Sequence, residues 1–149
     1  MALKKNLALK VACLSDKARV PTKGSEEAAC FDIYVADDIY LPPHATKKVG
    51  MGVAFDIPSG YRLDVYLRSS VAANTNVRLA NSVAKIDSDY TGELLLLLHN
   101  TGGTPVRFYN GERIAQCELN QVLPVELTQV DEITKQTNRG AGGVGSTGK

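Results

Sequence analysis

The chain is patterned in short stretches in which apolar and polar residues alternate, as they do in half-buried β-strands. Residues 61–67 show this most clearly, with apolar side chains on one face and polar side chains on the other. Glu93–His99 is almost wholly aliphatic, which predicts a strand buried on both faces or, by the same pattern, a short buried helix. Strands at this spacing, separated by turns, indicate an all-β sandwich or barrel. We expect strands over Ala8–Leu14, Phe31–Ala36, Asp38–Leu41, Lys48–Ile57, Tyr61–Leu67, Glu93–His99, Val106–Tyr109, Arg113–Leu119 and Val125–Val130, and a short helix over Ser70–Asn74.

The end of the chain has a different character. Asp131–Asn138 is polar, and Arg139–Lys149 holds five of the thirteen glycines. Such a segment has little to bury, so we divide the chain into a β-rich core, 1–131, and a mobile tail, 132–149. The tail's composition also suits a phosphate clamp, because glycines let backbone amides approach an anion. A disordered end is the simpler interpretation of the same composition.

Composition and charge narrow the class of protein. The 149 residues carry 17 basic and 16 acidic side chains, a net charge of +1, which argues against a nonspecific nucleic-acid binder. The longest aliphatic run, Leu94–Leu98, is far shorter than the ~20 residues that cross a membrane, and we see no signal peptide.

The cysteines and histidines are isolated along the chain. Cys13, Cys30 and Cys117 are widely separated, which favours free thiols in a reducing compartment. We therefore predict a cytoplasmic protein or, for a viral one, a protein of the host nucleus or cytoplasm. The two histidines stand alone, so a His-rich metal centre is not expected.

Three segments combine residues that suit phosphate chemistry. Arg68-Ser69-Ser70 ends the strand 61–67 and offers a guanidinium and two hydroxyls to an anion, although a helix N-cap explains it as well. Asp87 lies between two apolar stretches, where a carboxylate can deprotonate a water, although a polar turn with Asp89 is the alternative. Gly111–Gln116 reads on its own as a turn with an edge arginine and a surface glutamine.

Two further residues need partners. Tyr90 is placed to pack against a sugar or base. Asp32 lies inside an apolar run, where an unpaired charge is costly, so it should meet an arginine, a metal-bound water or solvent. None of these signals is specific alone, but their order and co-occurrence are.

In that order the segments resemble the five motifs of the trimeric deoxyuridine triphosphatase (dUTPase) family. The resemblance runs from Ala28 nearly to the end of the chain, and the third and fifth motifs are the most specific. The matching segments are Ala28–Ile33, Arg68-Ser69-Ser70, Asn81–Gly92, Gly111–Gln116 and Arg139–Gly148.

The resemblance implies a jelly-roll-like β fold and a homotrimer with three active sites at subunit junctions. The implied reaction splits dUTP and water into dUMP and pyrophosphate, with Mg²⁺ held mainly by the triphosphate. That reaction limits uracil in DNA and supplies dUMP for dTMP synthesis. Asp87 resembles the general base, an assignment that suits an ionised carboxylate at neutral pH. For a viral protein the resemblance also raises a regulatory protein partner.

The resemblance assigns the remaining site residues as well. Asn81 and the backbone near Lys85 and Ile86 resemble the uracil-reading hairpin, and Tyr90 resembles the residue that packs on the deoxyribose and excludes a 2′-hydroxyl. Asp32 resembles a residue that contacts either the sugar region or the metal's water shell. The residues that resemble the family's phosphate ligands are Arg68, Ser69, Ser70 and Gln116. Those that match the family's tail, which closes over the substrate, are Arg139, Val144, Gly145, Ser146 and Thr147.

Two departures and two alternatives accompany this assignment. Val144 stands where the family has an aromatic ring that stacks on uracil, and Lys85 stands where the family has an apolar residue. A dCTP deaminase on the same fold would carry a glutamate where this chain has Leu97. A nucleotide-sensing or protein-binding module without enzymatic activity is the other alternative.

Overall fold

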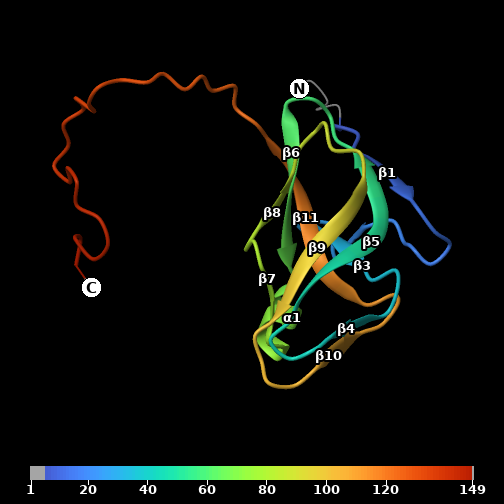
Figure 1. The fold of residues 1–149 in the computed structure, drawn as a ribbon. Helices are drawn as coiled ribbons and strands as arrows, with labels where there is room; N and C mark the ends of the chain where they lie inside the picture. Colours follow the sequence, from blue (N-terminus) through green and yellow to red (C-terminus); the bar gives the residue numbers. More distant parts are fainter. Residues whose placement is uncertain (1–5, 149) are drawn as a thin grey trace.

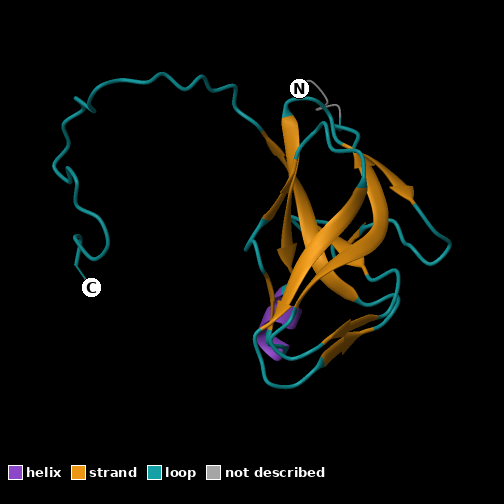
Figure 2. Cartoon of the chain, in the orientation of Figure 1, coloured by secondary structure: helices purple, strands orange, loops and turns teal. Residues whose placement is uncertain are grey.

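The computed structural model describes residues 6–148, and nearly all of its regular structure is β-strand (Figures 1 and 2). Its one helix, α1 (Ser69–Asn74), has six residues and is too short to cross a membrane. The strands are β1 (Lys10–Cys13), β2 (Thr22–Lys23), β3 (Phe31–Tyr34), β4 (Ile39–Leu41), β5 (Thr46–Asp56), β6 (Tyr61–Leu67), β7 (Val77–Leu79), β8 (Ala84–Ile86), β9 (Glu93–Asn100), β10 (Val106–Phe108) and β11 (Arg113–Gln121).

The strands form two principal antiparallel sheets and a small third one. One sheet has the order β1-β5-β9-β7, the other has the order β2-β3-β11-β6-β8, and β10 pairs with β4. The apolar faces of the two large sheets supply the core, as Leu96 of β9 and Leu63 and Val65 of β6 illustrate, each with no exposed surface. This arrangement confirms the predicted all-β, jelly-roll-like class.

The strand β6 follows its predicted alternation. Leu63 and Val65 point into the core, and Asp64 between them lies on the other side of the strand, where it is 3% exposed. The helix α1 begins one residue earlier than predicted. Its N-cap is Arg68, which makes no capping hydrogen bond through its side chain, so an N-cap role does not explain the two serines.

The prediction that the aliphatic strand is buried on both faces is wrong. Along β9, Leu94, Leu96 and Leu98 are buried, whereas Leu97 is 36% exposed. Only one face of this strand packs on the core, because the other face of its sheet lies open. The leucines of the open face are therefore available to a ligand or to another chain.

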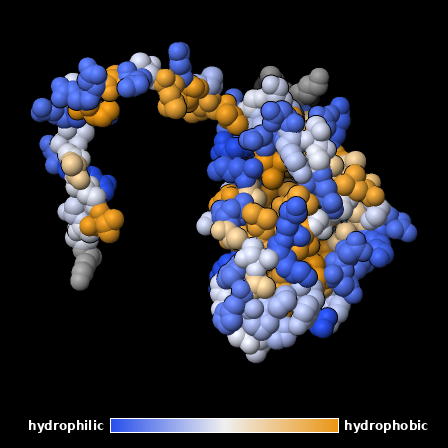
Figure 3. Space-filling model, viewed as in Figure 1, coloured by the Kyte–Doolittle hydropathy of each residue, from blue (hydrophilic) through white to orange (hydrophobic). Residues whose placement is uncertain are grey.

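The predicted strand Val125–Val130 is also absent. After β11 the chain leaves the body, and residues 122–148 contain no helix or strand (Figure 1). Apolar side chains of this segment face solvent, with Leu127 93% exposed, and they appear as orange patches where the tail leaves the body (Figure 3). The alternating pattern is that of a strand, but no strand of the described chain pairs with it. The boundary at residue 131 and the mobility of the tail stay predictions.

Candidate active site

The short strand β8 carries the third motif to the edge of a sheet. Among residues 6–148 its one partner strand is β6, through Leu63↔Ile86, Asp64↔Lys85 and Val65↔Ala84. Asp87 follows β8 directly, and a turn at residues 88–89 then leads to Tyr90. Because of this turn, Asp87 lines a cavity that Asp89 does not reach, although both residues line a second one.

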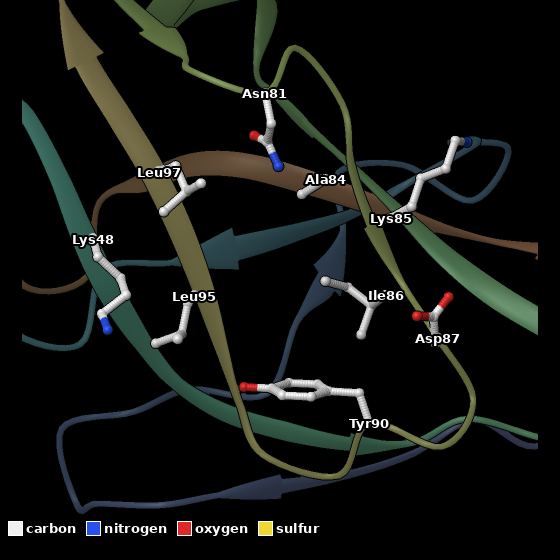
Figure 4. Close-up of a pocket in the computed structure, with 9 residues that line it drawn as sticks. All are labelled: Lys48, Asn81, Ala84, Lys85, Ile86, Asp87, Tyr90, Leu95 and Leu97. Atoms are coloured by element: carbon white, nitrogen blue, oxygen red, sulfur yellow. The ribbon is translucent and has the colours of Figure 1, made fainter.

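A cavity of about 310 Å³ lies between this segment and the open face of β5 and β9 (Figure 4). The side chains of Asn81, Ile86 and Tyr90 turn toward its interior (Figure 4). Its complete lining is Lys48, Asn81, Ala84, Lys85, Ile86, Asp87, Tyr90, Leu95 and Leu97. The amide of Asn81 both donates and accepts hydrogen bonds, which is what a pyrimidine edge requires.

Tyr90 forms one wall of the cavity in a fixed position. Its hydroxyl donates to the backbone oxygen of Glu93 at 2.7 Å. A Cβ added to Gly92 would lie 2.8 Å from that hydroxyl, so only glycine lets the ring fold back over the chain here. The pairing of Tyr90 and Gly92 in the motif thus has a steric reason.

Asp87 is the one carboxylate that lines this cavity in the described chain. It is exposed, and within residues 6–148 its side chain forms no ion pair or hydrogen bond. Such a carboxylate is free to accept a proton from water.

Sequence reasoning did not identify three residues of this lining, and it left the Lys85 side chain either near the substrate or in solvent. Lys48, Leu95 and Leu97 come from the open faces of β5 and β9, and Lys48 lies opposite Leu97 in the strand register. No local motif marks them, because the sheet pairing alone brings them here. The ammonium of Lys85 turns out of the cavity and contacts Asp64 at 2.9 Å, while its side chain stays 57% exposed.

A second group of predicted residues gathers beside the end of β6. Asp32, Arg68, Ser69 and Gln116 line a separate cavity of about 270 Å³, and Ser70 follows on α1. Gln116 donates its side-chain N–H to the backbone oxygen of the residue before Arg68 at 3.3 Å. The predicted phosphate ligands of the second and fourth motifs therefore do meet.

Asp32 anchors this group. Its carboxylate is 8% exposed and contacts Arg68 Nε at 3.3 Å and an Arg113 guanidinium nitrogen at 3.1 Å. Of the partners that the sequence allowed, the structure thus supplies arginines. One of these partners, Arg68, is itself a predicted phosphate ligand.

The described chain does not bring the two groups together. The register Leu63↔Ile86 places Asp87 opposite Arg62, at the start of β6, whereas Arg68 follows its end. Six strand residues separate these positions by roughly 20 Å. The tail residues Arg139, Val144, Gly145, Ser146 and Thr147 are exposed and lie away from both groups (Figure 1).

The site suits a metal ion that arrives with its ligand. No three His, Cys, Asp or Glu side chains of residues 6–148 come together as a metal cage. Mg²⁺ needs none, because it commonly binds substrate phosphates, waters and one or two carboxylates. Asp87 is exposed and unpaired, so its chemistry fits such a role or that of a base, whereas both oxygens of Asp32 already face arginines.

Comparisons with known proteins agree with this geometry. A family model for dUTPase matches residues 16–148. The deoxyuridine 5′-triphosphate nucleotidohydrolase of Nautilia profundicola is 38% identical over 141 residues, covering 95% of this chain and 99% of its own length. The corresponding protein of Helicobacter hepaticus is 34% identical over 144 residues, covering 97% of this chain and 90% of its own.

The chain is also similar to solved structures of dUTPases. The dUTPase of Staphylococcus bacteriophage 80alpha with dUPNHPP matches with a TM-score of 0.89 at 28% identity, covering 97% of this chain and 100% of its own. It is described as controlling transfer of virulence genes by a proto-oncogenic G protein-like mechanism. A variant dUTPase from phage phi11 of S. aureus matches with a TM-score of 0.78 at 26% identity, covering 85% and 98%, and is described as revealing the coordination of a structural Mg(II) ion.

Proposed function

The chain belongs to the dUTPase family, and on that premise we propose that it hydrolyses dUTP to dUMP and pyrophosphate with Asp87 as the general base. The observation that carries the proposal is the unpaired carboxylate of Asp87 at the rim of a cavity that Asn81 and Tyr90 also line. This reaction limits uracil in DNA and supplies dUMP for dTMP synthesis.

Asp87 takes a proton from water as the water oxygen attacks the α-phosphorus. A new P–O bond forms there, the bond to the bridging oxygen of the β-phosphate breaks, and pyrophosphate leaves. Asn81 and the β8 backbone near Lys85 and Ile86 read the uracil edge, since strand ends offer both donors and acceptors. Tyr90 packs on the deoxyribose, and its hydroxyl bond to Glu93 supports this by fixing the ring.

The phosphates bind Arg68, Ser69, Ser70 and Gln116 of another copy of the chain. Within one chain these residues lie roughly 20 Å along β6 from the position opposite Asp87, so one nucleotide cannot use both. Another copy of the chain is therefore needed to complete each site, and the resemblance to the trimeric dUTPases supports a homotrimer as the active unit.

Exposed apolar residues after β11 support an assembly. Leu123, Val125 and Leu127 alternate along the chain and are 72%, 74% and 93% exposed. In a monomer these three side chains stay in water. Burying them against another copy would stabilise the assembly by roughly 25 cal/mol per Å² of apolar surface.

Mg²⁺ bound to the triphosphate neutralises charge on the phosphate oxygens. Asp32 contributes chiefly by holding Arg68, and a contact to the metal's water shell is secondary to that role. The tail closes over the bound nucleotide, with Arg139, Gly145, Ser146 and Thr147 on the phosphates and Val144 over the base. Closure excludes water from the reacting groups.

The two alternatives explain the site less well. A deaminase needs a carboxylate where Leu97 lines the cavity, and within residues 6–148 Asp87 is the one carboxylate there. A binding module without activity needs no exposed base beside the pocket. A regulatory protein partner, suggested by the description of the 80alpha protein, is compatible with hydrolysis rather than an alternative to it.

The experiment is pyrophosphate release from dUTP with Mg²⁺, beside dCTP, dTTP and UTP, for the wild type and Asp87→Asn. We expect release from dUTP alone and a loss of about 10²- to 10⁴-fold in the variant. Release of ammonia from dCTP, or no release from any nucleotide, would reject the proposal.

A further inference from the structure

Asp64 is a buried carboxylate on the outer side of β6, outside every motif of the family. It is 3% exposed, whereas most charged residues of the chain face solvent. Three side chains converge on it: Arg62 Nε at 3.0 Å, Lys85 Nζ at 2.9 Å and Asn120 Nδ2 at 2.7 Å. The cluster joins β6 to both of its neighbours, because Lys85 lies on β8 and Asn120 on β11.

The carboxyl group of Asp64 is held in its charged form. Burial raises its pKa, but hydrogen bonds from Lys85, Arg62 and Asn120 outweigh burial, so the pKa lies below the usual value. A buried anion with three donors attracts the flexible ammonium of Lys85 more strongly than a solvated carboxylate does.

Lys85 has a competing acceptor on its own strand segment. Lys85 and Asp87 are two residues apart and extend to one side of β8, while Ile86 extends to the other (Figure 4). Within residues 6–148, Asp64 is the one acceptor that Lys85 contacts. Arg62, by contrast, also donates to the backbone oxygen of Gln121 at 3.1 Å. Removing the Asp64 charge would therefore take away the one acceptor that Lys85 contacts in the described chain, whereas Arg62 would keep its contact with Gln121.

We propose that Asp64 is a positioning residue that holds the Lys85 ammonium away from Asp87 and so leaves the Asp87 carboxylate free to act as the base. The inference rests on the proposed function. An ion pair between Lys85 and Asp87 would occupy carboxylate oxygens and oppose the uptake of a proton from water.

The test is a cycle of Asp64→Asn, Lys85→Met and the double variant, with kcat and KM for dUTP measured by pyrophosphate release. We expect Asp64→Asn to lower kcat about fivefold or more and to change KM less than about twofold, since the base pocket stays intact. We expect kcat of Lys85→Met to exceed that of Asp64→Asn. In the double variant, Asp64→Asn should lower the kcat of Lys85→Met by less than about twofold.

A purely structural ion pair predicts a different pattern. Asp64→Asn would then lower kcat by the same factor in the wild type and in Lys85→Met, because Arg62 and Asn120 lose their acceptor in both backgrounds. That result, or an unchanged kcat in Asp64→Asn, would overturn the inference. Circular dichroism checks folding, and if Asp64→Asn does not fold, Asp64→Ser, which admits water, replaces it in the same cycle. A wild type inactive on dUTP would instead refute the proposed function.

Discussion

Asp32 offers a direct test of whether its carboxylate anchors arginines or serves the metal. Asp32→Asn keeps the shape of the side chain but removes its charge. The carboxylate is 8% exposed, and it contacts Arg68, 29% exposed, and Arg113, 41% exposed. Removing one partner of a fully buried pair costs about 3–5 kcal/mol. Because water reaches both arginines, we expect a smaller loss of about 1–3 kcal/mol in the free energy of unfolding.

The assay is thermal unfolding of the metal-free protein at one fixed concentration, followed by kinetics. A loss of that size lowers Tm by about 3–10 °C in a chain of this length. Arg68 also loses its anchor, so kcat/KM for dUTP should fall by roughly tenfold or more. The matched control is Asp56→Asn, whose carboxylate pairs with Lys10 on the surface and should contribute less than about 1 kcal/mol.

The two roles of Asp32 give opposite results. An anchor lowers Tm without metal and leaves the Mg²⁺ concentration for half-maximal activity near that of the wild type. A residue of the metal's water shell leaves the metal-free Tm unchanged and raises that Mg²⁺ concentration. The second pattern would refute the reasoning.

Three further predictions address the tail and the thiols. Deletion of residues 132–149 should abolish turnover of dUTP while gel filtration still shows the trimer; unchanged turnover would reject a closing tail. Val144→Phe should lower KM for dUTP by about tenfold, since base–aromatic stacking contributes about 1–3 kcal/mol, and an equal or higher KM would count against it. Burial raises the pKa of Cys117 to about 12, so at pH 8 it stays protonated, and iodoacetamide should label exposed Cys13 but reach Cys117 only after denaturation, as mass spectrometry of peptides would reveal.

Alternation predicted the strands because most of them have one buried and one open face. For Tyr61–Leu67 it predicted the two fully buried apolar residues, Leu63 and Val65, but not the burial of Asp64 between them. It missed β2, β7 and β8, which have two or three residues and are held by their neighbours rather than by their own pattern. It failed for Val125–Val130, because a strand needs a partner and the described chain offers none.

The site was predictable where it follows motifs and not where it follows pairing. Asn81, Asp87 and Tyr90 lie together because they belong to one short segment. Lys48 joins them only through the register of β5 with β9, which no local signal reveals. The contact of Lys85 with Asp64 likewise depends on the pairing of β6 with β8.

The strand β6 explains why a small chain would need copies of itself to act. It presents Asp87 beside its start, through β8, and Arg68 at its end, and a stiff strand keeps these groups apart. No rearrangement of side chains spans roughly 20 Å, so an isolated chain keeps the proposed base apart from the proposed phosphate ligands. Leu123, Val125 and Leu127 add exposed apolar surface to an isolated chain, and burial against another copy would remove that surface from water.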